Sequence, residues 1–377
     1  MDNLNYAAIG NCTSAALVSR KGALEWCCLP YFDSTAFFAK ILDRDIGGEF
    51  AVRTDAGYEI SQRYLPKTNI LVTSFQRGKD RFELIDFMPR YKRDSGAYHC
   101  PPDIVRYVRH ISGQPVITVN YDPRPGYGLN EVKKEIRPDY IKVLTVGGSY
   151  ESIYLYSDID YRRIAEGKPI RIAQDHYFLL SYNQKLVELD LDAVQLEYEK
   201  TRVYWLNWSS QTRRFAGYNE EIVRSALVLK LLSFQKTGAI LAALTTSLPE
   251  EIGAVRNWDY RFCWLRDASM NIAVLTTLGH YRVARRFLDF ILDVIPYKDE
   301  KIQIMYGING KKNLSEKILP GLQGYAGSKP VRIGNDAYKQ KQNDIFGVLL
   351  DVIYQFLIIF KRDRVEDRED LWTVVRT

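Results

Sequence analysis

The sequence predicts an α+β protein whose first part is mostly β and whose second part is mostly helical. From residue 1 to about 195, short runs rich in Val, Ile, Tyr and Thr alternate with turn-forming residues, which is typical of an antiparallel β-sandwich. After about residue 196, apolar residues recur three and four positions apart, as on one face of a helix. We therefore expect a β-sandwich domain over residues 1–195, a helical linker over 196–215 and a helical domain over 216–377.

The clearest strand patterns lie at residues 140–146 and 152–157, where Ile, Val, Leu and Tyr are dense. Turn signals stand between such runs at residues 55–57, 112–113 and 183–184. No long helical pattern separates the runs, so consecutive strands are expected to pair in antiparallel fashion.

Helical periodicity recurs through the second part. The expected helices cover residues 196–206, 221–232, 268–278, 281–294 and 340–360, with another from 368 onward. Gly279 and Pro296 are expected to end two of them. Within the fifth, residues 346–360 carry apolar side chains on every side, which indicates a helix buried all round.

The last residues form an apolar stripe of Leu371, Trp372, Val374 and Val375, after which the sequence stops at Thr377. Because no cap or polar tail follows, this pattern suggests a helix that is cut in its middle. A natural C-terminal helix docked on the domain is the alternative.

Composition narrows the class of protein. The formal net charge is +6 over 377 residues, and basic and acidic residues alternate along the chain, so no nucleic-acid surface is expected. No secretory signal or bilayer-spanning segment is visible. Five cysteines without metal-ligand spacing fit reduced thiols in a cytoplasmic protein. Cofactor-binding motifs are absent too, so neither a cofactor nor a catalytic metal is expected.

The densest cluster of reactive side chains lies at residues 256–267, which hold three Arg, two Asp, two Trp and one Tyr just before an apolar helix. Arg and Asp form bidentate hydrogen bonds to sugar hydroxyls, and aromatic faces cover the apolar side of a pyranose. An ion-pair network that anchors the start of the helix explains the same residues equally well.

As a string, the cluster is more specific. Arg-Asn-Trp-Asp-Tyr-Arg at 256–261 and Trp-Leu-Arg-Asp-Ala at 264–268 resemble the signature of glycoside hydrolase family 15, the glucoamylase and trehalase-like group. Further segments resemble blocks of that family in the family's order: residues 9–19, 25–33, 245–250, 303–310 and 324–335.

The resemblance implies an N-terminal β-sandwich, a helical linker and the first part of an (α/α)6 barrel, here incomplete. It also implies an inverting hydrolase that releases glucose from the non-reducing end of an α-glucoside. By motif match, Arg266 and Asp267 would bind the terminal glucose, and Trp258, Asp259 and Arg261 would line the same wall. Four residues from later blocks would also reach the pocket: Tyr306, Arg332, Gln342 and Asp344.

Inverting hydrolysis needs a carboxylic acid and a second carboxylate about 6.5–9.5 Å away. The family's acid block, of the Gly-Ile-Trp-Glu type, does not occur in these residues, nor does its base, so no catalytic residue is carried over. Asp259 and Asp267 lie among arginines, which favour the ionised carboxylate, whereas a general acid must hold its proton. The sequence thus predicts a chain that is truncated before its catalytic glutamates.

Several functions stay open at this point. The chain is an α-glucosidase acting on a disaccharide or oligosaccharide, or a carbohydrate-binding or scaffold protein without turnover. A barrel of this type has twelve helices, and residues 216–377 supply about half of them. A homo-oligomer or a second chain that completes the barrel is therefore a further alternative, as is a β-sandwich interaction domain with a helical docking surface. The linkage that is cleaved is not predicted.

Overall fold

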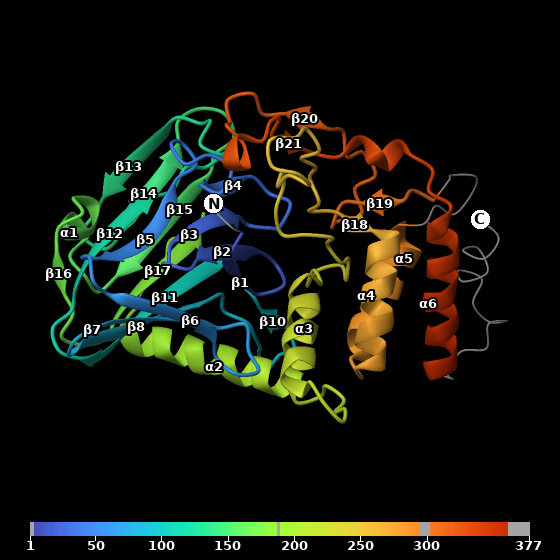
Figure 1. Ribbon diagram of the computed structural model, residues 1–377, viewed down its shortest axis with the longest axis horizontal. Coiled ribbons are helices and arrows are strands. Elements are labelled where there is room, and N and C mark those ends of the chain that lie inside the picture. Colours follow the sequence, from blue (N-terminus) through green and yellow to red (C-terminus); the bar gives the residue numbers. More distant parts are fainter. Residues whose placement is uncertain (1–3, 187–188, 295–301, 361–377) are drawn as a thin grey trace. The chain divides into compact units, whose positions relative to one another are not determined.

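A computed structural model describes residues 4–186, 189–294 and 302–360 (Figure 1). Internal contacts divide the chain into two compact units. The β unit comprises Met1–Trp208 and Gly321–Ala326, and the helical unit comprises Ser209–Pro320 and Gly327–Thr377. The predicted order of a sheet-rich part followed by a helical part is confirmed. The helix expected from residue 368, the apolar stripe at 371–375 and the stop at Pro296 lie outside the described residues.

Two antiparallel sheets form the β unit. The first has the order β1-β2-β3-β5-β12-β16, with β4 paired to β3: β1 (Tyr6–Gly10), β2 (Ala15–Ser19), β3 (Leu24–Cys28), β4 (Ala36–Ala39), β5 (Glu49–Thr54), β12 (Val116–Asp122) and β16 (Ile170–Arg171). The second has the order β13-β14-β15-β17-β11-β8-β7-β6: β6 (Glu59–Tyr64), β7 (Leu71–Arg77), β8 (Asp80–Phe87), β11 (Asp103–Ser112), β13 (Val132–Ile136), β14 (Ile141–Thr145), β15 (Ser152–Ser157) and β17 (His176–Tyr182). The predicted strands at 140–146 and 152–157 are β14 and β15.

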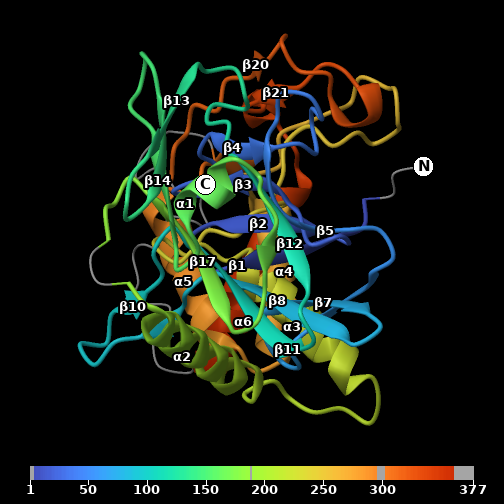
Figure 2. The same cartoon turned by 90° about the vertical axis from the view of Figure 1, so that its left-hand side faces the viewer.

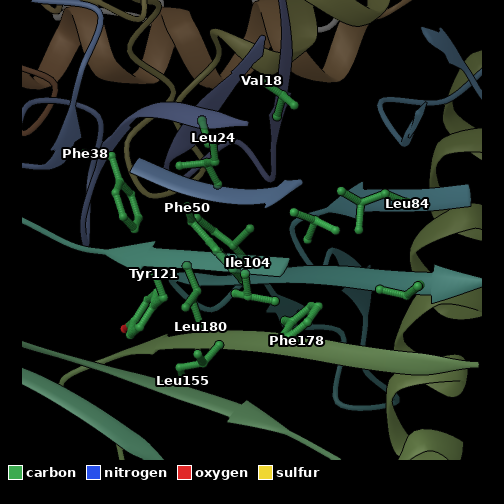
Figure 3. Close-up of a cluster of buried hydrophobic side chains, with 14 of the residues drawn as sticks. Val18, Leu24, Phe38, Phe50, Leu84, Ile104, Tyr121, Leu155, Phe178 and Leu180 are labelled. Carbon is green, nitrogen blue, oxygen red and sulfur yellow. The ribbon is translucent and has the colours of Figure 1, made fainter. Parts of the chain in front are cut away.

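One apolar core draws on strands of both sheets (Figure 3). Phe50 of β5 meets Phe178 of β17 edge to face, with ring centroids 5.6 Å apart. The alternation of side chains along each strand places such residues on the inner faces. Arg106 of β11 is also buried there, where its Nε donates to Asp86 Oδ1 at 2.8 Å and its Nη1 to the Phe50 carbonyl at 2.6 Å. The ion pair lies within the second sheet, and the bond to the Phe50 carbonyl of β5 links Arg106 to the first sheet.

Helix α2 (Leu191–Ser209) lies along the second sheet, beneath β8 and β11 (Figure 2). The ring centroid of Tyr198 is 5.8 Å from that of Phe87, and Gln195 donates to the Tyr107 hydroxyl at 3.2 Å. Two short elements complete this unit: the hairpin of β9 (Tyr91–Lys92) and β10 (Tyr98–His99), and helix α1 (Tyr161–Ala165). The helix predicted at 196–206 is part of α2.

Helices dominate the helical unit. They are α3 (Asn219–Leu231), α4 (Leu265–Thr277), α5 (Tyr281–Val294), α6 (Asp344–Phe360) and the short 3-10 helix η2 (Asp336–Lys339), and the paired strands are β18 (Cys263–Trp264) with β19 (Met305–Tyr306) and β20 (Lys317–Ile318) with β21 (Arg332–Ile333). The 3-10 turn η1 (Tyr325–Gly327) spans the boundary between the two units.

Most predicted helices of this unit are confirmed. The bounds of α5 match the expected 281–294, and Gly279, with φ of +94°, follows the end of α4 as predicted. The helix expected from 340 begins only at Asp344, because Asn335 caps η2 and Gln340 is extended.

The prediction that residues 346–360 are buried all round is wrong for the side chains that the structure describes. Ile345, Leu349 and Ile353 of α6 are buried, and α6 runs beside α4. By contrast, Leu350 and Tyr354 on the opposite stripe are 42% and 62% exposed. Across the described ranges, none of the helices combines the length and apolar character needed to span a bilayer.

Candidate functional site

The predicted site residues come from segments that one apolar cluster holds together. Trp264 precedes the first turn of α4, and Ile345 belongs to the first turn of α6; both are buried in the same cluster with Met305 of β19. The Leu265 N–H donates to the Ile304 carbonyl at 3.0 Å. The first turns of α4 and α6 are thus anchored to the same core, although they are about 80 residues apart in the sequence.

Four of the nine predicted residues meet at these two helix starts, and we call them the Arg266 cluster: Arg266, Asp267, Gln342 and Asp344. Arg266 Nη1 donates to Gln342 Oε1 and to Asp344 Oδ2, each at 3.1 Å. Its Nη2 lies 3.2 Å from Asp267 Oδ2. The hydrogen bond to Asp344, with the negative charges of Asp267 and Asp344, raises the pKa of the Arg266 guanidinium.

The cluster faces solvent. The side chain of Arg266 is 33% exposed, and those of Asp267 and Asp344 are 44% and 49% exposed. Each carboxylate stands in the first turn of its helix, where the helix dipole favours negative charge. The cluster therefore offers carboxyl oxygens as acceptors and a guanidinium as a donor side by side, a combination that suits a polyhydroxylated ligand.

A second group joins Trp258 and Arg332, which the sequence predicted separately. The Arg332 guanidinium carbon lies 4.6 Å from the centroid of the Trp258 ring. Its Nε is 2.8 Å from Glu316 Oε1, and its Nη1 donates to the Val255 carbonyl at 2.8 Å. The Arg332 N–H donates to the Ser247 hydroxyl at 2.7 Å. Both the side chain and the backbone of Arg332 are thus fixed by polar contacts.

Glu316 is a further member of this group, and the sequence motifs did not point to it. The pairing of β20 with β21 aligns Lys317 with Ile333 and Ile318 with Arg332, so residue 316 and Arg332 lie on the same face of the two strands. That pairing joins two strands of only two residues each, too short for a strand pattern.

Asp259 and Arg261 form a buried ion pair, with 0% and 2% of their side chains exposed. Arg261 donates to Asp259 through Nε at 2.9 Å, through Nη2 at 2.7 Å and through its backbone N–H at 3.1 Å. The Gly334 N–H donates to Asp259 Oδ2, and the Asn335 amide to the Asp259 carbonyl, both at 3.1 Å. These contacts tie the segment before α4 to the segment after β21.

Tyr306 is also buried, with 0% exposed, and its hydroxyl accepts the Gln303 N–H at 3.1 Å. Three of the nine predicted residues, namely Asp259, Arg261 and Tyr306, therefore lie below the surface. The Arg266 cluster and the Trp258–Arg332 pair keep exposed or half-exposed atoms. Within the described part of the chain, no group of His, Cys, Asp and Glu is arranged to hold a metal ion.

Comparison with known proteins gives matches along most of the chain. The family described as "Glycosyl hydrolases family 15" matches residues 216–377, and the one described as "Trehalase-like, N-terminal" matches residues 5–186. A trehalase from Thermoplasma volcanium is 35% identical over 93% of this chain. A trehalase from Mycolicibacterium smegmatis is 31% identical over 99%, and Trehalase 1 from Sulfolobus acidocaldarius is 33% identical over 98%.

The chain is shorter than these relatives. The matched regions span 56% of the Thermoplasma volcanium protein, 59% of the Mycolicibacterium smegmatis protein and 62% of the Sulfolobus acidocaldarius protein.

Proposed function

The chain belongs to the glycosyl hydrolases of family 15 and carries a trehalase-like N-terminal region. From that premise we propose that it acts as an inverting α-glucosidase or forms part of one. The proposed substrate is an α-glucoside disaccharide or oligosaccharide that releases glucose from its non-reducing end. Among disaccharides, trehalose is the leading candidate because similar proteins from three organisms are named trehalases. For the domains, we propose a β-sandwich at 1–195, a linker at 196–215 and part of an (α/α)6 barrel at 216–377.

The observation that carries the proposal is the Arg266 cluster. A glucosyl unit presents vicinal hydroxyls, each of which both donates and accepts hydrogen bonds. Asp267 and Asp344 supply exposed acceptors, and Gln342 supplies both a donor and an acceptor. Arg266 joins all three, so the geometry is organised before the ligand arrives. Preorganisation of this kind reduces the entropy lost on binding.

The other predicted residues take different parts in the proposal. Trp258 and Arg332 offer an aromatic face and a guanidinium for a second sugar ring. Asp259, Arg261 and Tyr306 support the wall from below, since their side chains are buried. No residue of this chain is assigned as the acid or base, because the exposed carboxylates of the cluster are held by Arg266 and suit hydroxyl binding.

The test is titration calorimetry of the full chain with trehalose and with maltose, together with an assay for released glucose. Asp344→Asn should weaken binding about tenfold or more, because it removes an acceptor and loosens Arg266. The matched control is Asp351→Asn on the same helix, where Asp351 accepts a hydrogen bond from Gln355 at 2.6 Å. Equal affinities for the two variants would refute the assignment of the site.

Hydrolysis and binding separate the two candidate functions. Glucose released by the full chain would establish a hydrolase. Binding that depends on Asp344 without any release would favour the second candidate, a carbohydrate-binding protein. Neither binding nor release with either sugar would refute both.

A further inference from the structure

Six residues of the second part of the chain pack into the β unit. They are Gly321–Ala326, which we call the crossover segment. In the sequence they lie between β20 and β21, and Arg332 is the first residue of β21. The chain therefore leaves the helical unit after Pro320 and returns to it at Gly327.

Asp43 is the main polar anchor of the crossover segment. Its Oδ2 accepts the Gln323 N–H at 3.0 Å, while its Oδ1 accepts the N–H groups of Asp45 and Ile46 at 3.0 and 3.1 Å. Only 3% of Asp43 is exposed. The Gln323 side chain adds a second bond, from Nε2 to Asp45 Oδ2 at 2.8 Å. A buried carboxylate that accepts three backbone N–H groups makes strong, charge-assisted bonds.

Apolar contacts hold the same six residues. Leu322 and Tyr325 are buried, with 2% and 6% exposed. Gly321 lies so close to Leu129 that an added Cβ would be 2.7 Å from its Cδ2. Gly324 takes a φ of +76°, a left-handed conformation that favours glycine. The crossover segment is thus packed closely into the β unit, with two buried side chains and a close backbone contact.

Beyond the crossover segment, the chain is held again within the helical unit. The Ser328 hydroxyl is buried and accepts the Gly253 N–H at 2.8 Å, and Asn257 donates to the Pro330 carbonyl at 3.3 Å. Arg332 follows, with its N–H on Ser247. Arg332 lies only nine positions after Gln323, so the two anchored stretches are close in the sequence.

We propose that the crossover segment is a positioning element. Through it, Asp43 of the β unit keeps the stretch of chain that carries Arg332 well ordered. Asp43 acts through the backbone of Gln323, whose N–H it accepts. This coupling between Asp43 and the segment of Arg332 does not depend on the proposed function. Only its importance for sugar recognition rests on that function.

The test is hydrogen–deuterium exchange of the full chain, followed by mass spectrometry. Asp43→Asn should speed exchange roughly tenfold in peptides covering 321–326 and also in those covering 327–335, because the variant weakens one charge-assisted anchor. The matched control is Asp160→Asn, since Asp160 also accepts two backbone N–H groups in the β unit, at the start of α1. Asp160→Asn should leave the exchange rates over 321–326 and 327–335 unchanged. Faster exchange that stops at residue 326 would overturn the proposal.

A second variant guards against misfolding of Asp43→Asn. Gln323→Ala removes only the exposed side-chain bond to Asp45, and it should produce a smaller rise in exchange over both 321–326 and 327–335. If Asp43→Asn does not fold, Gln323→Ala decides alone, and no rise over 327–335 then refutes the coupling. Calorimetry with trehalose on the same samples keeps the two hypotheses apart, since a chain that binds no sugar refutes the function and leaves the exchange result standing.

Discussion

Replacing Asp259 by Asn is expected to lower the free energy of unfolding of the helical unit strongly, because the Asp259 side chain is buried. The carboxylate accepts three N–H groups of Arg261 and one of Gly334. An Asn amide can offer its oxygen to only part of this set, and its NH2 group then faces other donors. The negative charge beside the buried guanidinium is also lost.

The magnitude follows from burial. Breaking a buried ion pair by removing one partner costs about 3–5 kcal/mol, because a charge is left in the interior without its counter-charge. For a unit of this size, each kcal/mol lowers the melting temperature by roughly 2–4 °C. Asp267→Asn is the matched control, since its carboxylate is 44% exposed and an exposed pair contributes about 1 kcal/mol or less.

The assay is urea unfolding followed by tryptophan fluorescence, with trehalose calorimetry on the same variants. Asp259→Asn should shift the unfolding midpoint strongly, and Asp267→Asn should leave it almost unchanged while weakening sugar binding. If Asp259→Asn unfolds like the unmodified protein but loses sugar affinity, Asp259 lines the pocket and the argument from its burial fails.

Three further predictions concern stability. Burial, reinforced by the charge of Glu197, raises the pKa of Asp103 to about 7, so its folded carboxyl favours stability at low pH and loses that contribution as pH rises towards 7; Asp103→Asn should therefore raise the unfolding free energy by roughly 2–4 kcal/mol at pH 8 and change little at pH 4. Burial lowers the pKa of His280 to about 4, so stability should fall by roughly 1–3 kcal/mol between pH 7 and 4, and denaturation profiles of His280→Gln should lack that part of the fall. Gly334 has a φ of +76°, and an added Cβ would lie 2.2 Å from the Ser315 carbonyl oxygen; Gly334→Ala should cost about 1–3 kcal/mol or more by urea unfolding, and an unchanged midpoint would contradict the geometry.

Local patterns in the sequence determined the order of the elements. The bounds of α5 follow from a strong amphipathic period, since Phe287 and Ile291 are buried on one face. Strand β15 follows from a dense run of β-formers. The ion pair between Arg266 and Asp267 can also be predicted from a sequence motif, because the two residues are adjacent in the sequence. The domain bounds at 195 and 215 stay a prediction.

Only the tertiary structure decided which members of the motif face solvent. Asp259 and Asp267 have the same side chain and similar arginine neighbours in the sequence, yet one is buried and the other is 44% exposed. Asp259 is contacted from far along the chain, since the N–H of Gly334, 75 residues later, donates to it. Contacts across such a distance depend on how the segments pack, and a local pattern of residue types does not encode that packing.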